Sequence, residues 1–234
     1  MKTYGQFCPL AQAVQLLCER WTLIVIREFI AGSTRFSELQ KGVPLMSPTL
    51  LSSRLKQLEK AGVIEISGNS RNHIYQLTDA GRELRPIVEL MGAWGHRWAR
   101  SDLRDSDLDA GLLMWDMRRS VDPSVFPAQR IVIQFEYPDA PEGAREWWLV
   151  AEDSEVDLCW HNHGYDVDLL IRCPLKVMSK IWICELTFDD AVAGRELVVM
   201  GDPALAGKLQ AWLRASPLSR LGTAKTLPVL GWHE

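Results

Sequence analysis

The sequence predicts an α+β protein of two domains: a small helical domain that ends in a two-stranded hairpin, then an antiparallel sheet with helices on one face. Three observations lead to this prediction. An amphipathic helical pattern at 47–61 is followed directly by two short apolar runs, 63–67 and 74–77. A polar, acidic stretch at 101–107 divides the 234-residue chain. Beyond it, apolar runs of strand length are interspersed with helical patterns. We expect domains at 1–100 and 103–234.

The first hundred residues begin with two helical patterns and a short third one. Residues 9–18 carry Leu10, Val14 and Leu17 on one side of a helix. Residues 21–30 are apolar almost all round, which is typical of the central helix of a bundle. Gly32-Ser33 ends it, and a short helix with Leu39 toward the core follows before the break at 41–44.

The pattern at 47–61 predicts a helix with one buried stripe and one polar face. Leu51, Leu55 and Leu58 recur at steps of four and three, with Leu50 beside them. The other face carries hydroxyls, an amide and cations, which can enter a groove lined with phosphates and base edges. A short helix, a turn, a longer helix and a hairpin make a winged helix-turn-helix. The expected DNA contacts on this helix are Ser47, Pro48, Thr49, Ser52, Ser53, Arg54, Lys56 and Gln57.

The turn between the two apolar runs is the expected wing. Arg71 and His73 lie between Gly68 and the returning strand, where a wing meets backbone phosphate. The alternative is an amphipathic helix on an ordinary α/β domain that never touches DNA. The hairpin follows the helix with no room for another element, which favours the winged arrangement.

Charge favours the first domain as the one that meets nucleic acid. Residues 1–100 hold 13 Lys and Arg against 8 Asp and Glu, a net charge of +5. The remainder holds 26 − 13 = 13 basic and 30 − 8 = 22 acidic residues, a net charge of −9. Cations release counterions when they bind phosphate, so we expect double-stranded DNA to bind the first domain.

After the wing, a long helix predicts a partner subunit. Thr78 is a suitable N-cap and Asp79 places a negative charge in the first turn. The helix continues to about Trp98 and carries more apolar surface than a small winged domain buries by itself. A two-fold homodimer is also what a recognition helix needs to read a palindromic site.

Several motifs of the first domain carry a family resemblance. They are Cys8-Pro9-Leu10-Ala11, Trp21-Thr22-Leu23 with Arg27-Glu28, Arg35-Phe36-Ser37-Glu38-Leu39, the run 47–62, and Tyr75-Gln76-Leu77-Thr78-Asp79-Ala80-Gly81. As a set they resemble the HxlR-type branch of winged-helix regulators, a relative of the MarR group, over about residues 5–98. The resemblance implies a homodimeric transcription regulator with the 47–61 helix in the major groove. The wing departs from this pattern, since Arg71 is its one arginine.

The second domain is expected to alternate helices and strands. The helical patterns cover 108–119, 174–185, 187–193 and 202–215, and the strand patterns cover 130–137, 146–151, 156–160, 167–172 and 196–200. The run from 185 to 213 resembles the C-terminal part of sterol-carrier-protein-like domains. That resemblance implies an apolar cavity for a hydrophobic or aromatic small molecule. Most tryptophans here should be core, and the pocket candidates are Trp115, Trp148, Trp160 and Trp182.

The five cysteines are widely spaced and form no Cys-x-x-Cys pair, so no disulfide framework is expected. Cys8 begins a helix, where unpaired amides favour thiolate, and is a redox-switch candidate; the alternative is a half-buried thiol at the dimer contact. Cys18 is expected in the core. Cys159, His161 and His163 alternate as strand-borne metal ligands do, but no fourth ligand is evident and we expect no metal.

These observations favour a cytoplasmic, homodimeric, sequence-specific DNA-binding repressor whose second domain senses a small molecule. No apolar run long enough to cross a membrane and no signal peptide is present, so no membrane partner is expected. No phosphate loop, nucleophile elbow or paired catalytic carboxylates appear, so neither an enzyme nor a cofactor is expected. The alternative is a carrier of lipids or hydrophobic small molecules whose winged module only dimerises. A third possibility is a thiol-sensing regulator with an inert second domain.

Overall fold

The structure is a computed structural model that describes residues 4–69, 72–99 and 103–223. The contacts divide the chain into two compact units, Met1–Met91 and Gly92–Glu234. The division falls inside helix α6 (Arg85–Trp98) rather than in the acidic stretch at 101–107. The cause is a helix that the sequence pattern did not reveal, α12 (Pro217–Gly222). It packs on the C-terminal half of α6, where Arg97 Nε donates a hydrogen bond to the Gly222 carbonyl at 2.8 Å.

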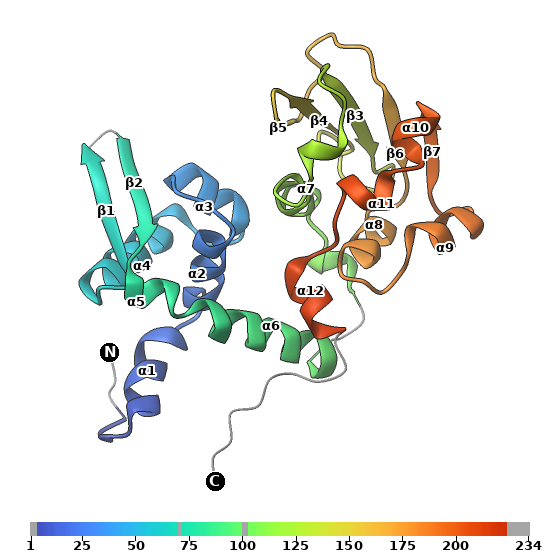
Figure 1. Cartoon of the computed structure of the whole chain (residues 1–234). Helices are drawn as coiled ribbons and strands as arrows, with labels where there is room; N and C mark the ends of the chain where they lie inside the picture. Colours follow the sequence, from blue (N-terminus) through green and yellow to red (C-terminus); the bar gives the residue numbers. More distant parts are fainter. Residues whose placement is uncertain (1–3, 70–71, 100–102, 224–234) are drawn as a thin grey trace. The chain divides into compact units, whose positions relative to one another are not determined.

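The first unit has the predicted order of elements (Figure 1). The predicted helix from 78 to 98 is two helices, since the chain breaks at Glu83 and Leu84. The wing strands are longer and their connection shorter than predicted. The elements are α1 (Pro9–Leu17), α2 (Thr22–Ile30), α3 (Phe36–Gly42), α4 (Pro48–Lys60), β1 (Ile64–Asn69), β2 (Asn72–Leu77), α5 (Asp79–Arg82) and the start of α6.

The core of this unit forms where α2, α3 and α4 meet. The predicted stripe of Leu51, Leu55 and Leu58 is buried, together with Leu39 of α3 and the α2 residues Val25 and Ile26. Helix α1 differs from the prediction, because Ala11 is its one buried residue and Leu10 is 67% exposed. Of the apolar side that the sequence indicates in α1, Leu17 packs against the core at the end of the helix, whereas Leu10 at its start faces outward in a single chain.

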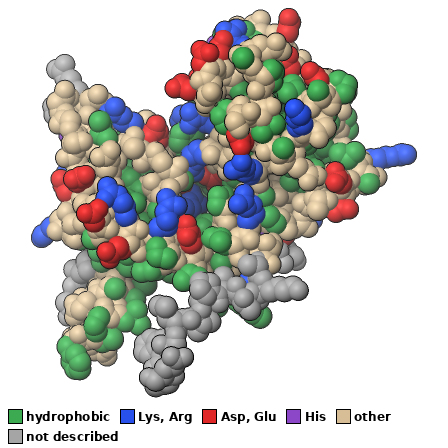
Figure 2. Space-filling model, in the orientation of Figure 1, with side chains coloured by type: hydrophobic (Ala, Val, Ile, Leu, Met, Phe, Trp, Pro, Cys, Tyr) green, Lys and Arg blue, Asp and Glu red, His purple; other side chains and the backbone are tan. Residues whose placement is uncertain are grey.

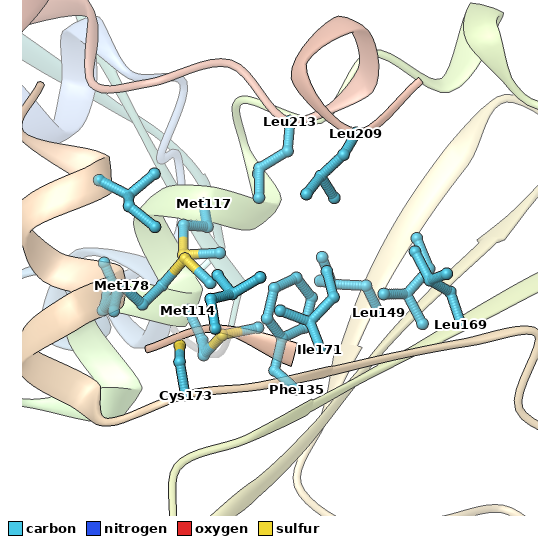
Figure 3. Packing of buried hydrophobic residues seen from close by; sticks show 14 of the residues in the cluster. Met114, Met117, Phe135, Leu149, Leu169, Ile171, Cys173, Met178, Leu209 and Leu213 are labelled. Atoms are coloured by element: carbon cyan, nitrogen blue, oxygen red, sulfur yellow. The ribbon is translucent and has the colours of Figure 1, made fainter. Parts of the chain in front are cut away.

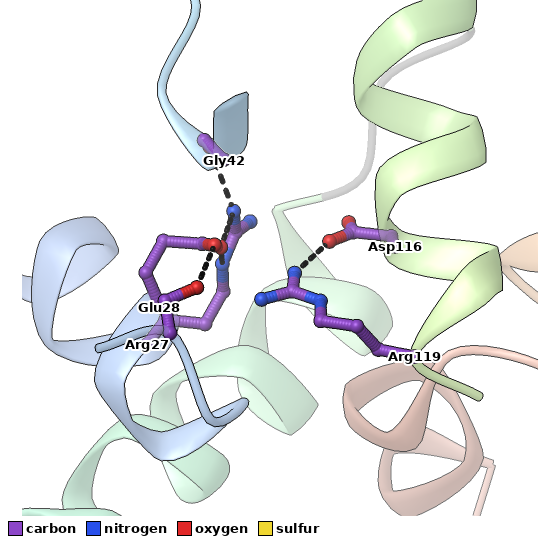
Figure 4. Close-up of polar contacts among 6 residues, drawn as sticks. Arg27, Glu28, Gly42, Asp116 and Arg119 are labelled. Atoms are coloured by element: carbon purple, nitrogen blue, oxygen red, sulfur yellow. Dashed lines mark hydrogen bonds and ion pairs between the residues drawn. The ribbon is translucent and has the colours of Figure 1, made fainter. Parts of the chain in front are cut away.

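A buried ion pair ties α2 to the end of α3 (Figure 4). The Glu28 side chain is fully buried, and Arg27 donates to its Oε1 from Nε at 3.1 Å and from a terminal nitrogen at 2.6 Å. The same Arg27 donates to the Gly42 carbonyl at 3.0 Å. A Cβ at position 42 would overlap the Glu28 carboxyl group. A side chain at position 42 would therefore force the buried Glu28 carboxylate to move.

The second unit contains a five-stranded sheet in the order β5-β4-β3-β6-β7. Its strands pair antiparallel, except that β3 and β6 are parallel. The predicted terminal helix is split at Gly207 and Lys208. The helices and strands are α7 (Ala110–Arg118), β3 (Ile131–Glu136), β4 (Glu146–Glu152), β5 (Glu155–Cys159), β6 (Leu169–Arg172), α8 (Leu175–Trp182), α9 (Phe188–Ala193), β7 (Val198–Gly201), α10 (Pro203–Ala206), α11 (Leu209–Trp212) and α12, with 3-10 turns η1 (Asp105–Asp107) and η2 (Pro123–Val125).

Alternate residues of the central strand face the helices, as strand geometry requires. Ile131, Ile133 and Phe135 of β3 are buried, and Ile133 lies beside Leu149 and Leu169 on the neighbouring strands. Figure 3 shows Phe135 and Leu149 of the sheet on the side of Met114 and Met117 of α7, Met178 of α8 and Leu209 of α11. The predicted arrangement, with helices sharing one core with one face of the sheet, is present. In the described residues no helix is long and apolar enough to span a membrane.

Candidate nucleic-acid interface

The turn between α3 and α4 is fixed by its own hydrogen bonds. Gln40 Nε2 donates to the Val43 carbonyl at 3.2 Å and to the Met46 carbonyl at 2.8 Å. Val43 and Met46 are each 1% exposed, so they fasten the turn to the core. Ser47 caps α4 by accepting a hydrogen bond from the Leu50 amide at 3.3 Å. The turn therefore sets the direction in which α4 begins.

Helix α4 presents its polar face to solvent. Ser47, Pro48, Thr49, Ser52, Ser53, Lys56 and Gln57 are all exposed. Leu50, which the sequence placed beside the buried stripe, is 39% exposed and lies on the open side as well. Hydroxyl, amide and ammonium groups at such a surface can bond to base edges and phosphates. The exposed apolar side chain can contact a thymine methyl group.

Arg54 differs from its neighbours, because its side chain is turned inward and only 6% of the residue is exposed. The guanidinium forms an ion pair with Glu19, donates to Gln57 Oε1 at 2.8 Å and reaches the Arg20 carbonyl at 3.3 Å. A cation held this way joins α4 to the segment before α2 and is not presented to a groove. We therefore assign Arg54 to positioning α4 and correct its place among the expected DNA contacts.

The hairpin β1–β2 has the register of a tight wing, with Gly68 opposite His73 and Asn69 opposite Asn72. Gly68 has φ +89°, and a Cβ there would overlap the Asn72 carbonyl oxygen, so the strands approach closely only with glycine. His73 is exposed, with its Nδ1 3.4 Å from the Tyr75 hydroxyl. Arg71 lies outside the described residues.

Sequence reasoning missed two residues that hold this interface together. Arg35 donates to Asn72 Oδ1 and, at 3.2 Å, to the His73 carbonyl, so it braces the wing from the start of α3. Glu38 accepts from the Thr34 and Arg35 amides at 2.8 and 2.9 Å and caps the same helix. The motif around Arg35 was visible in the sequence, but its contact with a strand 37 residues later was not.

A second exposed surface, on α6, is apolar. On α6 the side chains of Ile87, Leu90, Met91 and Trp94 are 36–56% exposed. Their spacing of three and four residues places them on one side of the helix. Phe7, just before α1, is 99% exposed. Figure 2 shows hydrophobic side chains gathered at the α1 end of the molecule. Apolar surface of this extent marks an interaction site.

The five cysteines differ in exposure, with Cys159 and Cys184 partly buried. Cys8 and Cys18 are exposed, whereas burial raises the pKa of the Cys173 thiol to about 12. Cys18 was expected in the core, and this prediction was wrong, because the residue is the C-cap of α1 and lies beyond its last packed turn. The Cys8 side chain makes no capping hydrogen bond. Its redox role stays a prediction.

These exposures predict distinct reactivities. At pH 8 a thiol reagent such as DTNB should modify Cys8 and Cys18 rapidly and leave Cys173 unmodified, because the thiolate is the nucleophile. Cys173 should react only after unfolding, or as the pH approaches its raised pKa of about 12. Peptide mass spectrometry of the modified protein identifies the sites. Labelling of Cys173 at the rate of Cys8 would contradict its burial.

The four candidate pocket tryptophans do not surround one cavity. Trp115 and Trp148 are 5% and 6% exposed, whereas Trp160 is 63% exposed. Trp182 borders a void of about 20 Å³, which is room for about one water molecule. The Arg118 and Arg119 guanidinium groups each lie 5.3 Å from the Trp115 ring centre, and Asp116 holds Arg119 (Figure 4). Trp115 is therefore a structural residue.

The three possible metal ligands, Cys159, His161 and His163, lie at the end of β5 and in the segment that follows it. The His161 and His163 rings lie 4.4 Å apart on an exposed segment. Burial, and then the charge of Asp157, raise the pKa of the Cys159 thiol, which disfavours the thiolate that a metal requires. Within the part of the chain that the structure describes, no group of three or more His, Cys, Asp or Glu residues is placed to hold a metal ion.

Comparison with known proteins matches the first unit to regulators. A family model described as HxlR-like helix-turn-helix matches residues 16–103. The HTH-type transcriptional regulator YvaP of Bacillus subtilis is 35% identical over 98 residues, which are 40% of this chain and 91% of the relative. YodB of the same organism, also an HTH-type transcriptional regulator, is 32% identical over 95 residues, which are 39% of this chain and 85% of the relative.

Other relatives are longer than the matched segment. For Rv3095 of Mycobacterium tuberculosis, also named as an HTH-type transcriptional regulator, the match is 37% identical over 90 residues, or 37% of this chain and 56% of the relative. Among solved structures, the reduced form of YodB from B. subtilis is 30% identical, with a TM-score of 0.36, and the match covers 41% of this chain and 97% of that one. The family match ends at residue 103, so the sterol-carrier-like character of the second unit stays a prediction.

Proposed function

The chain belongs to the HxlR-like helix-turn-helix family of transcriptional regulators, and from this premise we propose that it is a homodimeric, sequence-specific DNA-binding repressor whose second unit binds a small molecule. The observation that carries the proposal is the polar face of α4, which stands free of the protein's own packing. The positive charge of the first hundred residues supports the same assignment.

In this proposal the N-terminal part of α4 enters the major groove. Thr49, Ser52, Ser53 and Gln57 bond to base edges, because hydroxyl and amide groups can donate and accept there. Lys56 meets phosphate, and the exposed Lys60 one turn later adds to the field. The wing approaches the neighbouring backbone, where His73 is exposed and Arg71 is expected from the sequence.

Lys56→Ala tests this placement. In the homodimer this change removes two phosphate contacts, one from each α4 helix, so it should weaken binding at least about tenfold at physiological salt and reduce the steepness of log K against log salt by about 1.8. Because the operator is not defined, fragments are first selected from mixed genomic DNA by filter binding with the unaltered protein. Affinity for a selected fragment is then measured by fluorescence anisotropy between 50 and 300 mM salt.

Lys208→Ala is the matched control, since Lys208 is exposed in the second unit and its loss changes the net charge equally. It should leave both affinity and slope unchanged. Equal behaviour of the two variants would remove Lys56 from the interface. If the unaltered protein retains no fragment preferentially, the repressor proposal fails. That result would favour the alternative of a carrier for hydrophobic small molecules whose winged module only dimerises.

The apolar stripe on α6 supports the homodimer. A second copy of the stripe, related by a two-fold axis, would bury Met91 and Trp94 against their equivalents, as isologous interfaces do. The start of α1 also exposes apolar side chains, which a partner subunit would cover. A dimer would place the two α4 helices about one DNA turn apart, roughly 34 Å, so that each reads one half-site.

Trp94→Glu tests the dimer. A carboxylate in an apolar interface should weaken self-association at least tenfold, because burying an unpaired charge is costly. Sedimentation equilibrium of the full chain measures this. Val198→Glu is the control, since Val198 is 44% exposed in the second unit and the change is of the same kind. A dimer constant unchanged by Trp94→Glu would place the interface elsewhere.

A further inference from the structure

A surface cleft of about 470 Å³ lies at one end of the second unit's sheet. One wall is the segment that joins α7 to β3, including Phe126, Pro127 and Ala128. The other wall is the turn between β4 and β5, including Ala151 and Asp153. The volume falls within the range of small-molecule sites, roughly 300–1,000 Å³.

The walls of this cleft have a definite chemistry. Phe126 is half-buried, and on its other side the Trp212 ring lies 5.5 Å away, so the ring is held in place. Pro127 and Ala128 add apolar contacts, while the rest of the lining is mainly polar and includes Ser124 and Glu152. A fixed aromatic ring within a polar, acidic lining suits a cation that carries an aromatic or aliphatic body, because a ring face attracts a cation within about 6 Å.

The charges around the cleft are compensated except at one position. Arg130 holds Glu152 by two contacts of 3.0 and 3.1 Å. Ser124 donates its hydroxyl to Asp122 at 2.6 Å, and that carboxylate also pairs with Arg214. Among residues 4–69, 72–99 and 103–223, no hydrogen bond or ion pair engages the Asp153 side chain. The cleft therefore carries one uncompensated carboxylate.

The turn geometry fixes the backbone that carries Asp153. Asp153 and Ser154 have φ +51° and +66°, as a two-residue hairpin turn between antiparallel strands requires. Glu152 and Glu155 pair across the turn, which fixes the backbone on both sides. The Asp153 side chain thus projects from a short, defined connection at the mouth of the cleft.

We propose that this cleft binds a small organic monocation with an aromatic or aliphatic body, the charged group against Asp153 and the body against Phe126. The inference rests on the proposed function, because it names the ligand class of the second unit. It replaces the interior cavity expected from the sequence with a surface site. The net charge of −9 beyond residue 100 adds a field that attracts such cations.

Rhodamine 6G, a fluorescent planar monocation, is a suitable probe, and fluorescein, an anion built on a similar ring system, is its comparison. Binding to the full chain is followed by fluorescence anisotropy at low and high salt. Rhodamine 6G should bind and fluorescein should not. Asp153→Asn should weaken rhodamine binding about fivefold, and 1 M salt should weaken it similarly. Ala128→Trp, an exposed loop change that fills the cleft, should abolish it.

Asp166→Asn is the matched control, because Asp166 is an exposed carboxylate of the same unit outside the cleft lining. It should leave rhodamine affinity unchanged. The proposal is overturned if rhodamine does not bind, if Asp153→Asn and Asp166→Asn bind equally, or if Ala128→Trp still binds. The same protein is tested for DNA binding with and without rhodamine. Dye binding without DNA binding would support the cation-binding cleft and overturn the proposal of a DNA-binding repressor. DNA binding without dye binding would support the repressor and overturn the cation-binding cleft.

Discussion

Replacing Gly42 with alanine is expected to lower the free energy of unfolding of the first unit by about 3–5 kcal/mol. The new Cβ would overlap the Glu28 carboxyl group, so that group must leave its place. Arg27 would then lose its buried partner, and the contact between α2 and the end of α3 would open. Because α3 and its turn set the direction of α4, DNA affinity should fall together with stability.

A double-mutant cycle distinguishes this cause from a general intolerance of alanine at position 42. Glu28→Ala removes the carboxylate and makes room for the Cβ. The double variant should therefore be less destabilised than the sum of the two single variants, by about 1–3 kcal/mol. Hydrogen exchange of the full chain, measured in peptides covering α2 to α4, reports the local free energy. Simple additivity would show that Gly42 and Glu28 do not compete for one space.

Arg54→Met is expected to destabilise the first unit by about 2–3 kcal/mol. Methionine keeps much of the apolar stem but removes the guanidinium that joins Glu19, Gln57 and the Arg20 carbonyl. The cost is kept below that of a fully buried pair because the Glu19 side chain is 34% exposed. The same hydrogen-exchange measurement applies, with peptides from α4 and the segment before α2.

The salt dependence of DNA binding separates the two roles considered for Arg54. A positioning residue should leave the slope of log K against log salt unchanged, under conditions where the variant is fully folded. Lys56→Ala, from the same helix, should reduce the steepness of that slope by about 1.8, since the dimer loses two phosphate contacts. If Arg54→Met lowers it equally, Arg54 reaches phosphate in the complex and its buried position belongs to the free protein.

Most elements of both units follow from local patterns. The steps of Leu51, Leu55 and Leu58 located α4 and its buried side within a residue at each end. The strands were found because alternating apolar residues mark one buried face. The break between α5 and α6 and the helix α12 were not found. Leu84 continues the apolar spacing across the break, and the short α12 is held by contacts distant in sequence, with Arg97 of α6 and with the Trp182 carbonyl of α8.

The candidate interface was predictable in composition but not in detail. The polar residues of α4 could be identified, since a helical period separates two faces. The roles of Arg35 and Gln40 could not, because their partners lie in the wing and in the turn. The tryptophans were misleading for a similar reason. A large apolar side chain indicates burial but does not say whether a cavity remains beside it.

The sequence by itself determined the helix-turn-helix and the exposed polar face of α4, because apolar periodicity decides which side of an element is buried, and its motifs carried the family resemblance. Only the tertiary structure decided that the Arg54 side chain is buried in contacts with the segment before α2, whereas Lys56 and Cys18 are exposed to solvent. It also located the open cleft at the end of the sheet. The physical reason is that a polar side chain takes its role from the groups that meet it, and for Arg54 the decisive partner, Glu19, lies 35 residues away in the chain.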